Sequence, residues 1–125
     1  MLQILVVGLG GFLGAICRFF ITKLFNQFNI ILPFGTLVSN IIAAFILGLI
    51  VGIERNSQVL NPDLRAFITI GCLGGLSTFS AFSIETFMYL ELARYWKAAL
   101  NIFLNVGVSL LFVILGIILG KVIKG

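Results

Sequence analysis

The charges of this chain are gathered into short clusters, and the stretches between them are long enough to cross a lipid bilayer. The uncharged stretches are residues 1–17, 24–53, 66–84 and 98–120. A helix needs about 20 predominantly apolar residues to span the hydrocarbon core, so each stretch fits one crossing. We therefore expect a single domain, residues 1–125, with transmembrane helices near residues 2–22, 33–53, 66–90 and 98–120.

The composition excludes a soluble fold. The chain is 61% hydrophobic and only 10% charged, and its mean hydropathy is +1.24. A soluble domain of this size has too few charged residues to cover so much apolar surface. The first segment lacks the basic region and the small-residue cleavage site of a signal peptide, so we expect it to stay as the first helix. The sequence thus predicts an all-α, multi-pass protein of the cell membrane.

The basic residues are divided evenly between the two sides of the expected membrane. One side carries Arg55, Arg65, Lys121 and Lys124, and the other carries Arg18, Lys23, Arg94 and Lys97. The positive-inside rule needs an excess on one side, so it selects no orientation. Either the charge signal for orientation is weak, or the chain inserts in both orientations and opposite copies pair as an antiparallel homodimer. Because these cations belong at membrane interfaces, the net charge of +4 predicts no nucleic-acid partner.

Small and polar residues recur at a spacing of four in the first two expected helices, which places them on one helical face. Gly10 and Gly14 form such a face in the first helix and predict close helix packing. Arg18 continues it, either reaching the interface or attracting anions at a pore mouth. In the second helix Thr36 and Asn40 begin a similar ridge. A side-chain amide at that depth needs hydrogen-bond partners. Asn40 therefore either forms a hydrogen bond between helices or is a donor that lines a pathway.

The third expected helix contains a poor helix-forming run near its middle, where Gly74 and Gly75 precede Ser77 and Thr78. We expect a break there, which membranes tolerate only where the backbone is buried in protein or lines a cavity. Freed carbonyls at a break can bind a cation, although a simple packing kink is the alternative.

Phe79 and Phe82 follow the break on one face, with Ser80 beside them. The edge of a phenyl ring is positive and can meet an anion, although ordinary aromatic packing is the usual explanation for such a pair. In the fourth helix a second polar stripe contains Asn105 and Ser109. Together these donors predict a neutral path that suits a small hydrated anion better than a proton relay.

Three blocks of sequence resemble the Fluc family, also called CrcB, of fluoride channels. The blocks are residues 10–19 (GGFLGAICRF), 33–40 (PFGTLVSN) and 74–85 (GGLSTFSAFSIE), in the family's order. The resemblance implies an antiparallel, dual-topology homodimer of four-helix subunits with two fluoride pathways. It implies passive, selective exit of fluoride from the cytoplasm, which reduces fluoride toxicity.

The resemblance also implies roles for individual residues. Asn40 matches the pore asparagine, and Phe79 and Phe82 match the phenylalanines whose ring edges line the pathway. Ser80 and Ser109 match polar pore positions, and Arg18 matches an arginine near the vestibule. A central sodium ion (Na+) at the dimer interface would be held by the backbone carbonyls of Gly74 and Ser77. With the ridge residue Thr36, the expected fluoride pathway is Asn40, Phe79, Phe82, Ser80, Ser109 and Thr36.

Other functions compete with this interpretation. A small multidrug exporter shares the size and the span count but requires an acid in its first helix, and residues 1–17 contain none. A non-transporting assembly subunit explains the packing glycines but not the polar stripes. An enzyme is disfavoured because no nucleophile–base pair is evident. The chain has no histidine, and Cys17 and Cys72 lie apart in apolar segments, so we expect neither a side-chain metal site nor a disulfide.

Overall fold

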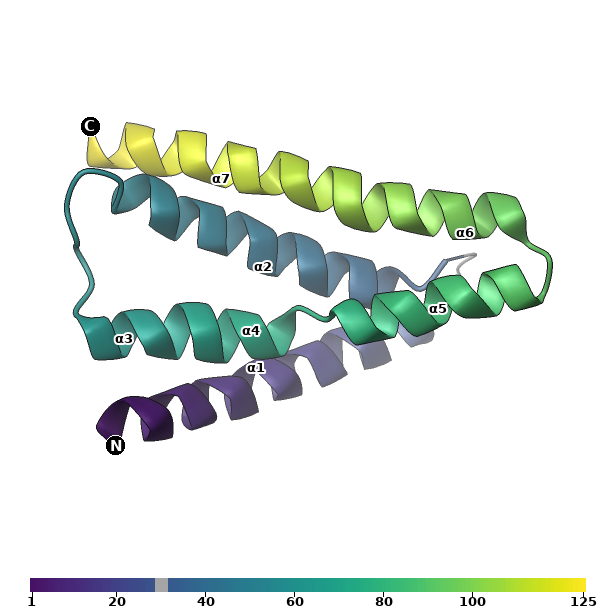
Figure 1. Cartoon of the computed structure of the whole chain (residues 1–125), viewed down its shortest axis with the longest axis horizontal. Helices are drawn as coiled ribbons and strands as arrows, with labels where there is room; N and C mark the ends of the chain where they lie inside the picture. Colours follow the sequence, from purple (N-terminus) through teal and green to yellow (C-terminus); the bar gives the residue numbers. More distant parts are fainter. Residues whose placement is uncertain (29–31) are drawn as a thin grey trace.

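The fold is known from a computed structural model that describes residues 1–28 and 32–125, shown in Figure 1. The sequence also predicts a polar hinge of Asn26, Gln27 and Asn29 before Pro33, and Asn29 lies outside the described residues. Within the described part every regular element is helical. The elements are α1 (Leu2–Asn26), α2 (Phe34–Ile53), α3 (Pro62–Ala66), η1 (Phe67–Cys72), α4 (Leu73–Leu76), α5 (Phe79–Glu91), α6 (Tyr95–Ile102), η2 (Phe103–Val108) and α7 (Ser109–Lys124).

These elements form four long rods, each apolar and long enough to cross a membrane. The rods are Leu2–Asn26, Phe34–Ile53, Pro62–Glu91 and Tyr95–Lys124. The all-helical class and four helices suited to crossing a membrane are thereby confirmed, and the protein is a multi-pass membrane protein. Both termini lie at the same end of the molecule, as an even number of crossings requires (Figure 1).

The third and fourth rods extend beyond the uncharged stretches that marked them in the sequence. The third begins at Pro62, not near residue 66, because Asn61 accepts a hydrogen bond from the Leu64 amide (2.8 Å) and caps the helix. Proline suits the first helical position, whose amide has no helical partner in any case. The fourth rod starts at Tyr95, directly after a tight turn in which Ala93 has a positive φ of 57°. Each of these two rods therefore begins with a helical segment that contains charged residues, ahead of its uncharged stretch.

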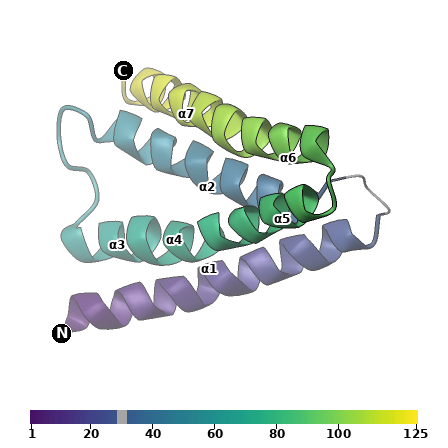
Figure 2. The ribbon, with the colours of Figure 1, turned by 45° about the vertical axis from the view of Figure 1, so that its right-hand side comes forward.

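Helices α2 and α7 lie side by side (Figures 1 and 2), and glycines bring their backbones into contact. Gly48 and Gly52 of α2 are buried against the carbonyls of Val113 and Ile117. In return, Gly116 of α7 faces the backbone of Phe45 and Leu49. A side chain at any of these glycines would meet backbone atoms that have no rotamer to change. The spacing of four along both helices therefore makes a continuous backbone contact, as small residues do between membrane helices.

A second glycine contact joins α1 to the first half of the third rod. Gly10 and Gly14 are buried in α1. A Cβ at Gly10 would collide with the backbone of Phe67 and Cys72, and a Cβ at Gly75 would come within 2.6 Å of the Gly11 carbonyl. The expected packing face of the first helix is therefore a close helix–helix contact.

Two segments of the third and fourth rods are π-helical, and each carries a polar side chain that bonds to the backbone. In η1 the Thr69 hydroxyl donates to the Arg65 carbonyl four residues earlier, at 2.8 Å. In η2 the side-chain nitrogen of Asn105 donates to the backbone carbonyl of Asn101, also four residues earlier, at 3.0 Å. Single π-turns in α-helices are frequent at functional sites. Both segments contribute to the cavity described below.

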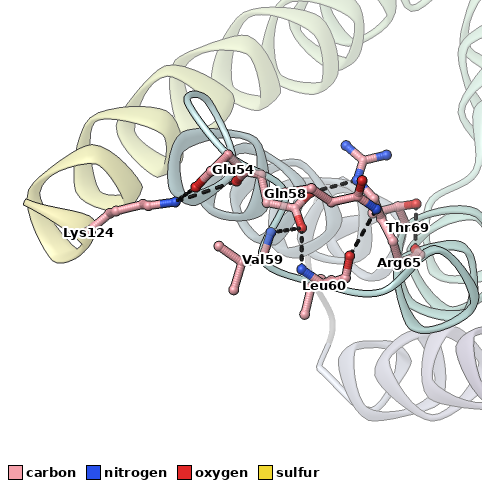
Figure 3. A network of polar contacts seen from close by, with 8 residues as sticks. Glu54, Gln58, Val59, Leu60, Arg65, Thr69 and Lys124 are labelled. Atoms are coloured by element: carbon pink, nitrogen blue, oxygen red, sulfur yellow. Dashed lines mark hydrogen bonds and ion pairs between the residues drawn. The ribbon is translucent and has the colours of Figure 1, made fainter.

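The connection between α2 and α3 is organised by one carboxylate, shown in Figure 3. Glu54 has a side chain that is only 7% exposed, and it accepts a 2.6 Å hydrogen bond from Nε of Arg65. Its other oxygen accepts from the amides of Val59 (3.2 Å) and Leu60 (2.7 Å). The Arg65 guanidinium and these amides hold the pKa of Glu54 below its ordinary value.

This arrangement makes the stability of the connection depend on pH. Because the folded pKa of Glu54 is lowered, its contribution is complete above the ordinary glutamate pKa of about 4.3 and is lost as the pH falls through the folded pKa. We expect Glu54→Gln to lower the thermal midpoint of the purified protein by a few degrees at pH 7. The difference from the unchanged protein should shrink towards pH 3. Glu91→Gln, which alters an exposed glutamate at the other end, is the control, and an equal loss there would refute the assignment.

Candidate functional site

A cavity of about 430 Å³ lies between α2, the middle of the third rod and the η2–α7 segment. It collects most of the residues that the sequence singled out. Of the expected site residues, those in its lining are Asn40, Gly74, Ser77, Phe79, Phe82 and Ser109. Thr69, Thr78 and Asn105 add further polar groups. The lining residues carry no acidic or basic side chain, so the cavity offers neutral dipoles to whatever enters it.

Asn40 is the centre of the polar contacts in this cavity. Its side-chain oxygen accepts a 2.7 Å bond from the amide of Thr78, and its nitrogen donates to the Thr78 carbonyl at 3.2 Å. The same nitrogen donates to the side-chain oxygen of Asn105 at 3.0 Å. One side chain of α2 is thus bonded to the third and fourth rods at once.

The bond to Asn40 alters the backbone where α4 ends. Ser77 and Thr78 are extended, with ψ of 153° and 122°, and α5 starts at Phe79. In a continuous helix the Thr78 amide would donate to the Gly74 carbonyl, but here it donates to Asn40. The Gly74 carbonyl therefore loses its usual helical partner at the cavity wall. The Thr78 hydroxyl accepts from the Ala81 amide at 3.2 Å and caps α5.

Arg18 reaches the same region from α1. Its Nε donates to the Gly75 carbonyl at 3.1 Å, so the half-buried guanidinium satisfies another carbonyl at the end of α4. This contact joins α1 to the extended residues. The vestibule role expected for Arg18 stays a prediction.

Phe79 and Phe82 form an edge-to-face pair at the start of α5. Their ring centroids are 5.3 Å apart and their planes are inclined by 64°. Phe82 is buried, with 8% of its surface exposed, whereas Phe79 is 76% exposed. The outer ring therefore has space around it, and the inner ring is fixed by its neighbours.

The remaining expected residues differ in their surroundings. The Ser109 hydroxyl is buried and has no hydrogen-bond partner among the described residues. Ser80 is exposed, and its hydroxyl shares a 3.2 Å bond with that of Thr78. Thr36 is buried and donates to the Glu85 carboxylate at 2.6 Å. Neither Ser80 nor Thr36 is part of the cavity lining described above.

Sequence reasoning gave Thr78 no role in the site, and it included Asn105 only as part of the polar stripe of the fourth helix. Asn105 bonds to Asn40 and to the Asn101 side chain (3.1 Å), and Asn101 in turn donates to the Thr86 hydroxyl (3.0 Å). The available signal was the spacing of four that links Asn101, Asn105 and Ser109. That spacing places them on one face but does not say which helix the face meets.

A family model described as "CrcB-like protein, Camphor Resistance (CrcB)" matches residues 5–117 of this chain. The chain belongs to the CrcB family. The resemblance drawn from the three sequence blocks is thereby confirmed, and the match extends through all four rods.

Curated members of the CrcB family align along nearly the whole chain. The chain is 40% identical over 120 residues to the fluoride-specific ion channel FluC of Clostridium novyi, covering 95% of this chain and 94% of that one. It is 44% identical over 115 residues to the FluC channel of Shewanella halifaxensis, covering 91% and 92%. The aligned part of the chain therefore covers nearly the full length of these relatives.

Proposed function

We propose that this protein is a fluoride-selective ion channel through which cytoplasmic fluoride leaves the cell passively, down its electrochemical gradient. The observation that carries the proposal is the neutral cavity in which the Asn40 amide and the unpartnered Ser109 hydroxyl lie with Phe79 and Phe82. The relatives named fluoride-specific ion channels support it. Such an activity is transport, and no bond is made or broken, so the protein is not an enzyme.

The chemistry of the cavity suits a small anion that holds its water tightly. A pore must replace that hydration shell with donors yet bind weakly enough to release the ion. Amide and hydroxyl donors and the positive edges of phenyl rings provide this without a fixed cation that would trap the anion. In our proposal the pathway comprises Asn40, Phe79, Phe82, Ser80, Ser109 and Thr36, with Arg18 at its vestibule.

We also propose that Pro62–Glu91 is one crossing, broken in the membrane at Ser77 and Thr78, and that two subunits pair antiparallel in a dual-topology homodimer. The balanced cations support pairing in opposite orientations. The mass of the purified protein in detergent tests the dimer. A single labelled cysteine added at the C-terminal end, accessible from both sides of the membrane, would support dual topology.

A sodium ion at the centre of that dimer is part of the proposal. Among the described residues no cluster of His, Cys, Asp and Glu is suited to a metal. Backbone carbonyls are hard oxygen ligands, and the Gly74 carbonyl lacks its usual helical partner. Gly74 and Ser77 of each subunit would supply the carbonyls, so the residues fit a sodium ion. Retention of radioactive sodium by the purified protein through a desalting column tests this site.

The ring-edge argument predicts the behaviour of two substitutions. Phe79→Ile and Phe82→Ile keep an apolar side chain but remove the positive ring edge, so we expect each to lower fluoride flux by about tenfold or more. Phe103→Ile, which removes an exposed ring outside the cavity lining, is the matched control. The measurement is fluoride efflux from vesicles at equal protein content. Unchanged flux in both variants, with the dimer intact, would contradict a role for the rings.

The function itself is tested with purified protein in liposomes loaded with either fluoride or chloride and monitored by ion-selective electrodes. We expect rapid fluoride loss and retained chloride. Loss that depends on a proton gradient would favour an exporter. No loss from folded protein would favour a non-transporting assembly subunit.

A further inference from the structure

A basic cavity lies at the end of the α2–α7 pair, beside the C-terminus marked in Figure 1. Its volume is about 500 Å³, and its lining includes Arg55, Asn56, Lys121, Lys124 and Gly125. It is at the opposite end of the molecule from the α5–α6 turn and does not share a residue with the cavity that contains Asn40.

The close approach of α2 and α7 gathers these cations. Gly52, which also lines the cavity, and Gly120 each lie against the backbone of the opposite helix. The last turn of α7 and the residues that follow α2 are therefore held side by side. Arg55, at the end of one helix, and Lys121, in the last turn of the other, consequently face the same space.

The positive charge of this cavity is not neutralised by the neighbouring acid. Both oxygens of Glu54 are engaged by Arg65 and by backbone amides, as described above. Arg55 and Lys121 make no hydrogen bond or ion pair within the described part of the chain. Lys124 donates from Nζ to the Ser57 carbonyl (3.4 Å) and to the Ser57 hydroxyl. Arg55, Lys121 and Lys124 are the charged side chains in its lining, so the cavity is positive.

The surface next to the cavity is apolar. On the last two turns of α7, Ile118, Val122 and Ile123 are all more than half exposed, with Val122 at 71%. A free anion in water gains no favourable contact from an apolar surface, whereas a phospholipid has acyl chains to place on it. These chains need apolar contact directly below the lipid phosphate. In a membrane protein, a basic pocket between helix ends at the interface matches that combination.

We propose that this cavity binds the phosphate of an anionic phospholipid, with Arg55 and Lys121 as its principal partners and the apolar end of α7 against the acyl chains. The inference is independent of which ion the protein conducts. Every subunit would carry one such site at the membrane surface where its C-terminus lies.

The test is native mass spectrometry of the purified protein in detergent, titrated with phosphatidylglycerol or with phosphatidylcholine. We expect tighter binding of phosphatidylglycerol. Arg55→Gln and Lys121→Gln should each weaken it about fivefold, and the double variant about twenty-fivefold, because a cation near a membrane surface contributes about that factor. Neither side chain has another bond to a residue that the structure describes, so the fold should be unaffected, which an unchanged elution volume would verify.

The matched control is Lys23→Gln with Arg94→Gln, which removes the same charge at the opposite end. We expect it to change phosphatidylglycerol affinity less than about twofold. The proposal is overturned if this control weakens binding as much as the double variant, or if phosphatidylcholine binds equally well. Displacement of phosphatidylglycerol by an equal concentration of inorganic phosphate would also overturn it, because the site would then be one for free anions.

Discussion

Asn40→Ala is expected to reduce fluoride flux by about a hundredfold and to loosen the protein at the same time. The substitution deletes the side chain that joins the third and fourth rods in the proposed pathway, since its two amide hydrogens bond to the Thr78 carbonyl and the Asn105 side-chain oxygen. It also leaves the amide of Thr78 and the side-chain oxygen of Asn105 without their partner. A buried hydrogen bond contributes about 1 kcal/mol, and an abandoned buried polar group costs more, so a loss of about 2–3 kcal/mol follows. Efflux and the thermal midpoint in detergent measure the two effects.

The neighbouring residue provides a strict control for Asn40. Ser39 is fully buried, with 0% of its surface exposed, and its hydroxyl has no partner among the described residues. Ser39→Ala should therefore leave both flux and stability close to those of the unchanged protein. If Asn40→Ala conducts fluoride normally, Asn40 is a packing residue, and the pathway must be sought elsewhere.

The second large effect is expected at the α2–α7 contact. In Gly116→Ala the new methyl group would meet the Phe45 carbonyl and the Leu49 amide, which are backbone atoms in the middle of a helix. The helices must separate to admit it, and overpacking of this kind costs about 3 kcal/mol. We expect a marked fall in the thermal midpoint and in the yield of folded protein from membranes.

The control for Gly116 is the same change where space is free. Gly8 of α1 has no atom within 4 Å of an added Cβ, and alanine is the better helix former. Gly8→Ala should be neutral or slightly stabilising. If both variants had the same thermal midpoint, α2 and α7 would not be in backbone contact.

The sequence was sufficient to predict the four long helices, because the placement of the charges alone divides the chain into four apolar segments. It also indicated Asn40, Phe79 and Ser109, since polar or aromatic residues at regular spacing in an apolar segment stand out. Their convergence on one cavity could not be predicted, because the rotation of each helix is set by its neighbours. The bond from Asn40 to the Thr78 backbone is an example, as it joins residues 38 apart in sequence.

Other features were invisible to sequence patterns for a physical reason. The π-helical segments η1 and η2 form where Thr69 and Asn105 bond to carbonyls one turn earlier, yet many such residues sit in ordinary α-helices. The engagement of Glu54 by Arg65 depends on the path of the connection between α2 and α3. Residue spacing does not encode that path.

The α2–α7 contact has a consequence for the order of events during synthesis. It joins the second helix to the last one, so Gly48 and Gly52 have no partner until α7 has left the ribosome and entered the bilayer. The contact between α1 and the third rod, by contrast, can form while the fourth rod is still being made. We therefore expect a chain interrupted before Ser109 to hold one completed helix pair and one open glycine face. Such a nascent chain would be the species most exposed to membrane proteases.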